Sequence, residues 1–526
     1  MPIEIIVKYS GDIETALAQL GGIAERLSST IAIVTIDEDK IHQLANLPQI
    51  EYVEKPVGIS LNMRESLYHA CISTKITSDL TGQGVIVALL DSGIDYTHPD
   101  FRDESGKSRI LYLWDMAAKG TPPPGFATGH LHTTEEINNM LSSPNPPNLD
   151  IIGHGTAVAG VAAGNGRAGG GLEAGVAPEA AIVAVKLGAG SKTIDLMRGL
   201  KFVADICAAT SKPCAINISF GTNEGAHDGR SLFEEYVDEV ADSHNIVVVV
   251  AAGNEGSAGH HFSGRLTTGQ SEAVEFFVSG GATRVYLVLW KDFADIFTIE
   301  ITPPTGQGLG ENTQIYMGEP THYNPDQLIF IELGSKNGFV PQGLWTLIIT
   351  SISSVKGNYH IWLPTTEEVG HATAFARPTP DATITMPATA TNPITVGAYN
   401  AILNSYAEFS GRGFVSGDLP IKPDLVAPGV NVLAAKAGGG YDTYSGTSIA
   451  APFVTGAAAL LMEWGIVQGN DPGLYGQRIK AYLHRGATRS PDRVYPNDRW
   501  GYGALCLETT LDYLQLQQHK PLRSKL

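Results

Sequence analysis

Cysteine, positive charge and long apolar runs are all scarce in this chain of 526 residues. An excess of 54 acidic over 35 basic residues gives a net charge of −19, which argues against a nucleic-acid partner and favours solubility. No apolar run is long enough to cross a bilayer. The first residues mix charges with apolar side chains and lack a secretory signal, so we expect a cytoplasmic protein. Its four cysteines lack the close paired spacing of a zinc site and are interpreted as reduced intracellular thiols: Cys71, Cys207, Cys214 and Cys506.

The first sixty residues form a unit of their own. Short runs in which apolar and polar residues alternate, as in strands, are interspersed with runs whose apolar residues have helical spacing. Their order is β-α-β-β-α-β, with Asp12 as a plausible N-cap of the first helix. This order predicts a ferredoxin-like split motif. Residues 57–81 are expected to form a connection to the next domain.

Four apolar runs after residue 82 have the continuous character of central parallel strands: "GVIVALLDSG", "AAIVAVKLG", "PCAINISFG" and "NIVVVVAAGN". Helix-period segments lie between the later runs, so the fold class is α/β with a doubly wound parallel sheet. In such sheets ligands bind outside the carboxyl ends of the strands. The residues that follow each run are therefore the candidates for chemistry.

Between residues 260 and 373 the alternation of strand and helix stops. Six short strand-like runs separated by Gly, Pro and Asn predict an antiparallel β-sandwich or jelly roll inserted into the α/β domain. The buried-strand pattern then returns with "NPITVGAY". The predicted domains are the N-terminal unit (1–62), the first part of the α/β domain (63–259), the insert (260–373) and the second part of the α/β domain (374–526).

Three motifs place reactive side chains at strand ends or helix starts. Asp91 ends the first buried strand, His154 stands between glycines before a small-residue helix, and Ser448 opens another helix in "SGTSIAAP". Each alone has an ordinary explanation as a cap or a structural residue. Together they supply the orienting carboxylate, base and nucleophile of acyl transfer. Asn254 follows a central strand, where its amide suits the anionic oxygen of a tetrahedral intermediate, beside the backbone N–H of Ser448.

With these motifs the chain resembles the subtilisin-like serine proteases, or subtilases. The segments "DSGIDYTHPDF", "GHGTAVAG", "AAGNEG" and "GTSIAAP" match four signature regions of that family, in its order Asp, His, Asn, Ser. The resemblance implies a serine endopeptidase with Asp91, His154 and Ser448 as the triad and Asn254 in the oxyanion hole. It also implies that substrate peptides bind as an added strand beside two enzyme segments. The expected substrate-binding residues are Leu187, Gly188, Ser219, Phe220, Gly221, Ala251, Ala252 and Gly253.

The resemblance assigns the first unit the role of a propeptide that assists folding and then inhibits. Self-cleavage is expected near residues 60–64, and a permanent N-terminal domain is the alternative. The insert, this propeptide and the "RWGYG" segment are similar to the Csp germination proteases of clostridial spores. That similarity implies a spore-located enzyme, a protein substrate that is the pro-form of a cortex-lytic hydrolase, and a propeptide that stays bound as an inhibitor. No nucleic-acid or membrane partner is expected.

Two other functions remain open, a general intracellular subtilase and a catalytically silent binding scaffold. A purely structural role for the insert, bracing the protease domain, is also open. No cofactor is expected. Asp100 matches a carboxylate of a subtilase calcium site, but the partner loop is replaced by "GNGRAGGGLEAG", which offers few of the oxygen ligands that calcium needs.

Overall fold

The computed structural model describes most of the chain: residues 2–18, 20–26, 30–54, 63–73, 76, 79–188, 190–304, 313–323, 326–335, 338–413 and 420–518. The chain divides into two compact units, Met1–Leu61 and Asn62–Leu526. Each unit has its own hydrophobic core and is described by itself below.

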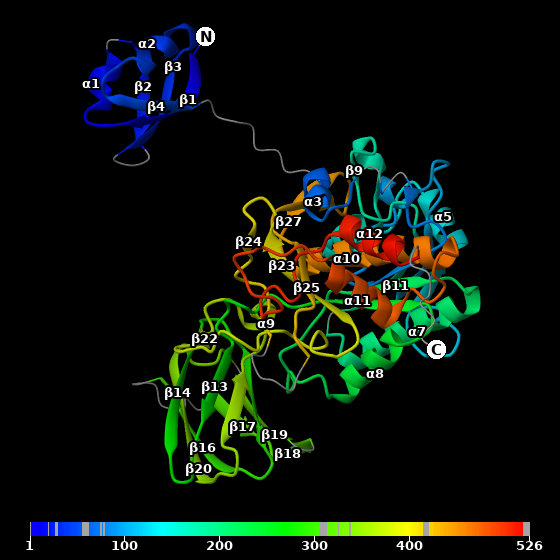
Figure 1. Ribbon diagram of the computed structural model, residues 1–526. Coiled ribbons are helices and arrows are strands. Elements are labelled where there is room, and N and C mark those ends of the chain that lie inside the picture. The colour runs from blue at the N-terminus through cyan, green and yellow to red at the C-terminus, as the bar shows by residue number, and fades with distance from the viewer. Residues whose placement is uncertain are drawn as a thin grey trace, which may run out of the picture. The chain divides into compact units, whose positions relative to one another are not determined.

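The N-terminal unit is a four-stranded antiparallel sheet in the order β2-β3-β1-β4 (Figure 1). Asp12 accepts hydrogen bonds from the backbone N–H groups of Glu14 and Thr15, as expected of an N-cap. This order, with a helix after the first and third strands, confirms the predicted ferredoxin-like motif. Its elements are β1 (Pro2–Tyr9), α1 (Ile13–Ala18), β2 (Ile23–Arg26), β3 (Ile31–Asp37), α2 (Ile41–Ala45) and β4 (Ile50–Glu54).

The second unit is built on a nine-stranded sheet whose central strands are parallel, in the order β24-β23-β12-β11-β5-β10-β6-β7 with β25 beside β23. This confirms the predicted α/β fold class. The strands are β5 (Ile86–Asp91), β6 (Ile110–Asp115), β7 (His130–Thr133), β10 (Ala181–Lys186), β11 (Cys214–Ile218), β12 (Ile246–Ala251), β23 (Ile394–Asn400), β24 (Ser405–Tyr406) and β25 (Leu425–Pro428).

Both faces of this sheet are covered by helices, so its central strands are buried along their whole length. Val87 and Leu89 of β5 pack on one face, whereas Ile86, Ala88 and Leu90 pack on the other. Burial on both faces is the reason that these strands are continuously apolar. The helices are α5 (Thr134–Leu141), α6 (His154–Ala163), α7 (Thr193–Thr210), α8 (Leu232–Ala241), α10 (Thr447–Met462), α11 (Gly476–Gly486) and α12 (Leu507–Gln518).

Helix α10 runs through the core of the second unit. The segment Thr447–Val467 is apolar and long enough to span a membrane, but 94% of it is buried inside the protein. We therefore assign it as the central core helix. It contacts α6, β11, β12 and β23. These contacts hold the first turn of α10 against the ends of the strands.

The segment between β12 and β23 forms an antiparallel β-sandwich, seen as the green strands of Figure 1. One sheet has the order β13-β21-β15-β19-β17 with β18 beside β19, and the other has the order β16-β20-β14-β22. Side chains from both sheets form one core. A jelly-roll topology stays a prediction. The strands are β13 (His261–Arg265), β14 (Ser271–Val278), β15 (Arg284–Asp292), β16 (Ile296–Thr302), β17 (Thr313–Met317), β18 (Thr321–Tyr323), β19 (Asp326–Ser335), β20 (Gly343–Ser353), β21 (Asn358–Trp362) and β22 (Ala374–Phe375).

The expectation that all four cysteines are reduced is wrong. The predicted connection includes helix α3 (Met63–His69), and residue Cys71 just after it forms a disulfide with Cys506. Cys207 and Cys214 are buried free thiols, as expected. The bonded pair lies 435 residues apart in the sequence, so no spacing rule had indicated it. The disulfide ties α3 to the start of α12.

Candidate active site

The start of helix α6 is held in place by a buried carboxylate. Asp150 is fully buried and accepts the backbone N–H groups of Gly153 and Thr156 at 2.9 and 2.8 Å. It also accepts a hydrogen bond from the hydroxyl of Ser92 at 2.8 Å. Ser92 directly follows Asp91, the last residue of β5. Negative charge at a helix N-terminus is stabilised by the orphan N–H groups there. Asp150 therefore fixes the first residue of α6, His154, against the end of β5.

Asp91 and His154 form a close pair. Asp91 is 1% exposed, and its Oδ1 lies 2.7 Å from His154 Nδ1 and accepts the Ser92 backbone N–H at the same distance. A carboxylate can only accept, so the Nδ1 atom of His154 carries the proton of that bond. In the neutral ring the other nitrogen, Nε2, has its lone pair free, as a general base requires.

The environment of His154 also sets its protonation. Burial lowers the pKa of the imidazole, but the charge of Asp91 and its hydrogen bond raise it by more, to about 9. An imidazolium formed by accepting a proton is thus stabilised beside Asp91. The imidazole side chain is still 32% exposed, so a substrate can reach it from the cleft.

Ser448 lies in the first turn of α10, and its backbone is braced from β11. The Ser219 hydroxyl donates to the carbonyl oxygen of Ser448 at 3.2 Å, and Asn217 donates to that hydroxyl at 2.8 Å. Among the described residues, the Ser448 hydroxyl donates to the Ser219 carbonyl oxygen, 3.5 Å away, and not to His154. Such bonds are often loose without substrate. Ser448 and His154 nevertheless line one cleft of about 550 Å³.

Asn254 follows β12 and reaches the same helix start. Its Oδ1 accepts the backbone N–H and the hydroxyl of Thr447 at 2.9 and 3.1 Å. Because the oxygen is engaged in this way, the amide NH₂ group is the part of the side chain left to donate. Asn254 lines the cleft beside Ser448, where a donor would stabilise an oxyanion.

The predicted substrate-binding residues fall into two adjoining hollows. Leu187 and Gly188 line a neighbouring pocket of about 270 Å³, and the active-site cleft is lined by Ser219, Ala251 and Gly253. Phe220 and Gly221 line both hollows. Ala252 is fully buried and lines neither hollow, so its role in substrate binding stays a prediction. Its side chain packs instead in the core beside β12.

Thr385 is a cleft residue that the sequence reasoning missed. Its hydroxyl oxygen would lie 2.3 Å from a Cβ placed on Gly221 and 2.5 Å from one placed on Gly253. The side chain is therefore wedged between the two glycines and closes the floor of the cleft. No motif surrounds Thr385, and only its position between two distant strand ends reveals its role.

Asp100, the possible calcium ligand, is satisfied by hydrogen-bond donors. Its Oδ1 accepts the backbone N–H of Ala168 at 2.8 Å, and both of its oxygens accept the hydroxyl of Tyr441. The guanidinium of Arg167, in the same Gly-rich loop, donates to the carbonyl oxygens of Asp103 and Glu104. These donors and this cation occupy the place where a calcium site needs free oxygen atoms. The residues present do not fit calcium.

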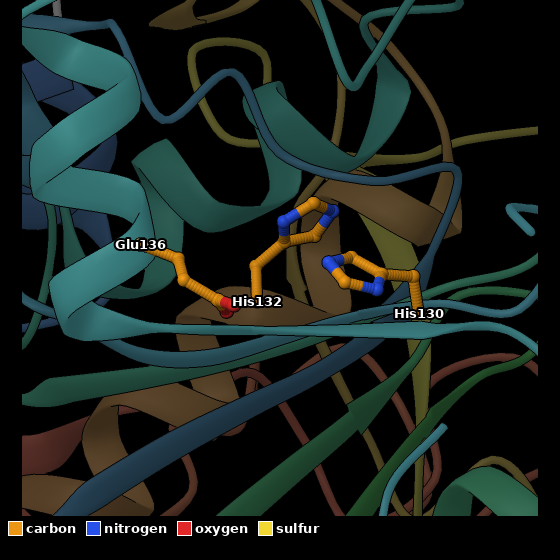
Figure 2. Close-up of side chains that lie close together, drawn as sticks. All are labelled: His130, His132 and Glu136. Atoms are coloured by element: carbon orange, nitrogen blue, oxygen red, sulfur yellow. The ribbon is translucent and has the colours of Figure 1, made fainter. Parts of the chain in front are cut away.

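A second cluster of possible metal ligands is His130, His132 and Glu136, whose ligand atoms lie within 4.8 Å of one another (Figure 2). Glu136 closes a capping box by accepting the Thr133 backbone N–H at 2.8 Å. His130 Nδ1 accepts the Thr121 N–H at 3.0 Å, so the proton of the neutral ring lies on the nitrogen nearer the cluster. Metal binding through that nitrogen would move its proton to Nδ1 and break the bond from Thr121. We therefore assign these residues a structural role at the N-terminus of α5.

Comparison with known proteins agrees with this geometry. The subtilase family profile matches residues 82–284 and 350–503, and the Csp protease B prodomain profile matches residues 1–57. The chain belongs to the subtilase family. The CspB protease of Clostridium perfringens is 36% identical, with a TM-score of 0.78 over 87% of this chain and 99% of that one. This subtilase is therefore of the Csp type.

Curated relatives are more distant. The minor extracellular protease Vpr of Bacillus subtilis is 24% identical over 81% of this chain and 51% of its own length. Subtilisin E of the same species is 30% identical over 43% of this chain and 50% of its own length. The chain thus spans about half the length of these two relatives.

Proposed function

We propose that this subtilase is a serine endopeptidase made as a zymogen. The observation that carries the proposal is the Asp91–His154 pair at 2.7 Å in the same cleft as Ser448 and Asn254. Ser448 Oγ attacks the scissile carbonyl carbon while His154 Nε2 takes the hydroxyl proton. The oxyanion that forms accepts hydrogen bonds from the Asn254 amide and the Ser448 backbone N–H.

The proton held by His154 then passes to the leaving amine as the carbon–nitrogen bond breaks. An acyl-enzyme ester on Ser448 remains. Water attacks this ester, again with His154 as the base, and releases the carboxylic acid product. Throughout, Asp91 holds the imidazole in one tautomer and stabilises its cationic form.

Self-processing is the first test of this mechanism. Intact mass and N-terminal sequencing of the purified wild type should show a cut near residues 60–64, and Ser448→Ala should stay whole. Residues 60–62 of that window lie outside the described part of the chain, and Met63 begins α3. Ser142→Ala, an exposed serine at the end of α5, is the matched control and should process normally. Processing of Ser448→Ala would overturn the assignment of the nucleophile.

We further propose that its substrate is the pro-form of a cortex-lytic hydrolase in spores. The match of the first 57 residues to the Csp protease B prodomain and the likeness to CspB support this choice. Incubation of such a pro-form with the wild type should give one truncated product, absent with Ser448→Ala. General digestion of unfolded casein without cleavage of the pro-form would instead favour the turnover function.

We also propose that the propeptide stays bound after cleavage and that the protein acts inside the cell or the spore. The N-terminal unit has its own core, centred on Val7, Ile13 and Val34, so it can remain folded once cut. After processing, both fragments should co-elute on gel filtration. Elution of the N-terminal fragment alone would contradict retention.

A further inference from the structure

Strand β21 of the insert leads the chain back to the active-site cleft. After β21, the Leu363 backbone N–H donates to the His260 carbonyl oxygen at 2.9 Å, and Asn223 Nδ2 donates to the Leu363 carbonyl oxygen at 3.0 Å. The short helix α9 (Thr366–Val369) follows, and Thr365, Thr366, Glu367 and His371 line the cleft together with the triad residues. One wall of the cleft therefore belongs to the insert.

This wall is anchored next to the oxyanion residue. Glu255, which follows Asn254, is 4% exposed and accepts the Thr366 backbone N–H at 3.0 Å. The same carboxylate lies 2.6 Å from Nδ1 of His260, whose Nε2 lies 2.7 Å from the carbonyl oxygen of Thr373. The segment around α9 is thus hydrogen-bonded to Glu255 at both ends, directly at Thr366 and through His260 at Thr373. These bonds fix the position of the segment relative to Asn254.

Two neighbouring acids on α9 have different surroundings. Glu368 is engaged, since its Oε2 accepts the Thr365 N–H and the Tyr286 hydroxyl, both at 3.1 Å. Glu367 is exposed, lines the cleft and forms no ion pair with any residue that the structure describes. Its charge is also one of those that raise the pKa of His154. The cleft wall therefore presents one uncompensated negative charge close to the reacting groups.

The position of this charge indicates which part of a substrate it meets. The neighbouring pocket around Leu187 and Gly188 includes no residue of the insert. Glu367 borders the cleft that contains Ser448 and His154. We propose, on the basis of the protease function above, that Glu367 selects substrates with Lys or Arg within two residues of the scissile bond.

The test uses the full-length, self-processed protein and internally quenched peptides. The peptides copy the sequence around a bond that the wild type cuts in denatured casein, with Lys, Gln or Glu placed in turn at each of the two positions before and the two positions after the cut. The readout is kcat/KM at one fixed pH. An exposed ion pair is weak, so wild type should prefer Lys over Glu by about three- to tenfold at one position.

Glu367→Gln should reduce this Lys-to-Glu ratio to about twofold or less, and Glu367→Lys should reverse it. Each variant's rates are divided by its own rate on the Gln peptide, because the charge of Glu367 also raises the pKa of His154. Glu300→Gln, an exposed acid on β16 of the same insert, is the control and should keep the wild-type preference. A Lys preference that survives in Glu367→Lys, or no preference in an active wild type, would overturn this inference but leave the proposed protease function intact. A wild type that cuts no bond, like Ser448→Ala, would overturn the proposed function and the inference with it.

Discussion

Replacing Thr385 by glycine should widen the floor of the active-site cleft. The Thr385 side chain is 3% exposed, and its hydroxyl oxygen lies in the space that side chains on Gly221 and Gly253 would occupy. The substitution removes three heavy atoms from this point. At about 0.8 kcal/mol for each methylene-sized group that a substrate side chain buries instead, the gain is about 2 kcal/mol. This corresponds to roughly a 30-fold change in selectivity.

The resemblance to subtilases implies that Gly221 and Gly253 border the pocket for the residue before the cut. The assay therefore compares kcat/KM for peptides that differ only in that residue, alanine or phenylalanine. The Phe-to-Ala ratio should rise about 30-fold in Thr385→Gly, whereas Thr385→Val, which keeps the volume, should leave the ratio within about threefold. The new cavity should cost about 1–3 kcal/mol of stability, so thermal unfolding is measured beside the kinetics. An unchanged ratio in a folded Thr385→Gly variant would refute the placement of Thr385 at the floor.

Four further predictions concern single contacts. Asn254→Ala should lower kcat by about 10²–10³, the loss measured for the oxyanion donor of subtilisin and taken over here, with little change in KM; an unchanged kcat would contradict its role. Because His154 has its pKa raised to about 9 and must be neutral to accept a proton, kcat/KM should rise with pH towards that value; a plateau already reached at pH 6.5 would be inconsistent with the pairing. In denaturant without reductant, thiol titration should find two groups rather than four, since Cys71 and Cys506 are bonded. Asp424→Ala should destabilise by about 3–5 kcal/mol in chemical denaturation, because it leaves two buried lysines without their carboxylate; a loss below about 1 kcal/mol would argue against that network.

Local sequence patterns were sufficient for the fold class and for the reactive groups. The runs that became β5, β11 and β12 are apolar apart from Asp91 at the end of β5 and Asn217 in β11. They are apolar because both faces of the sheet are covered, and the residues themselves reveal that burial. Asp91 and Asn254 were found because each stands just after such a run, where the carboxyl ends of parallel strands meet. His154 and Ser448 were found because small residues mark two helix starts.

What the sequence by itself could not determine is every contact between segments far apart in the chain. Cys71 meets Cys506, Thr385 fills the gap between Gly221 and Gly253, and Glu367 reaches the cleft only because the insert folds back onto Glu255. Periodicity reports whether a residue is buried, but not which distant residue buries it. The sequence therefore specifies the chemistry that this subtilase carries, whereas the packing of the insert and of the strand ends decides the shape and charge of the cleft that a substrate enters.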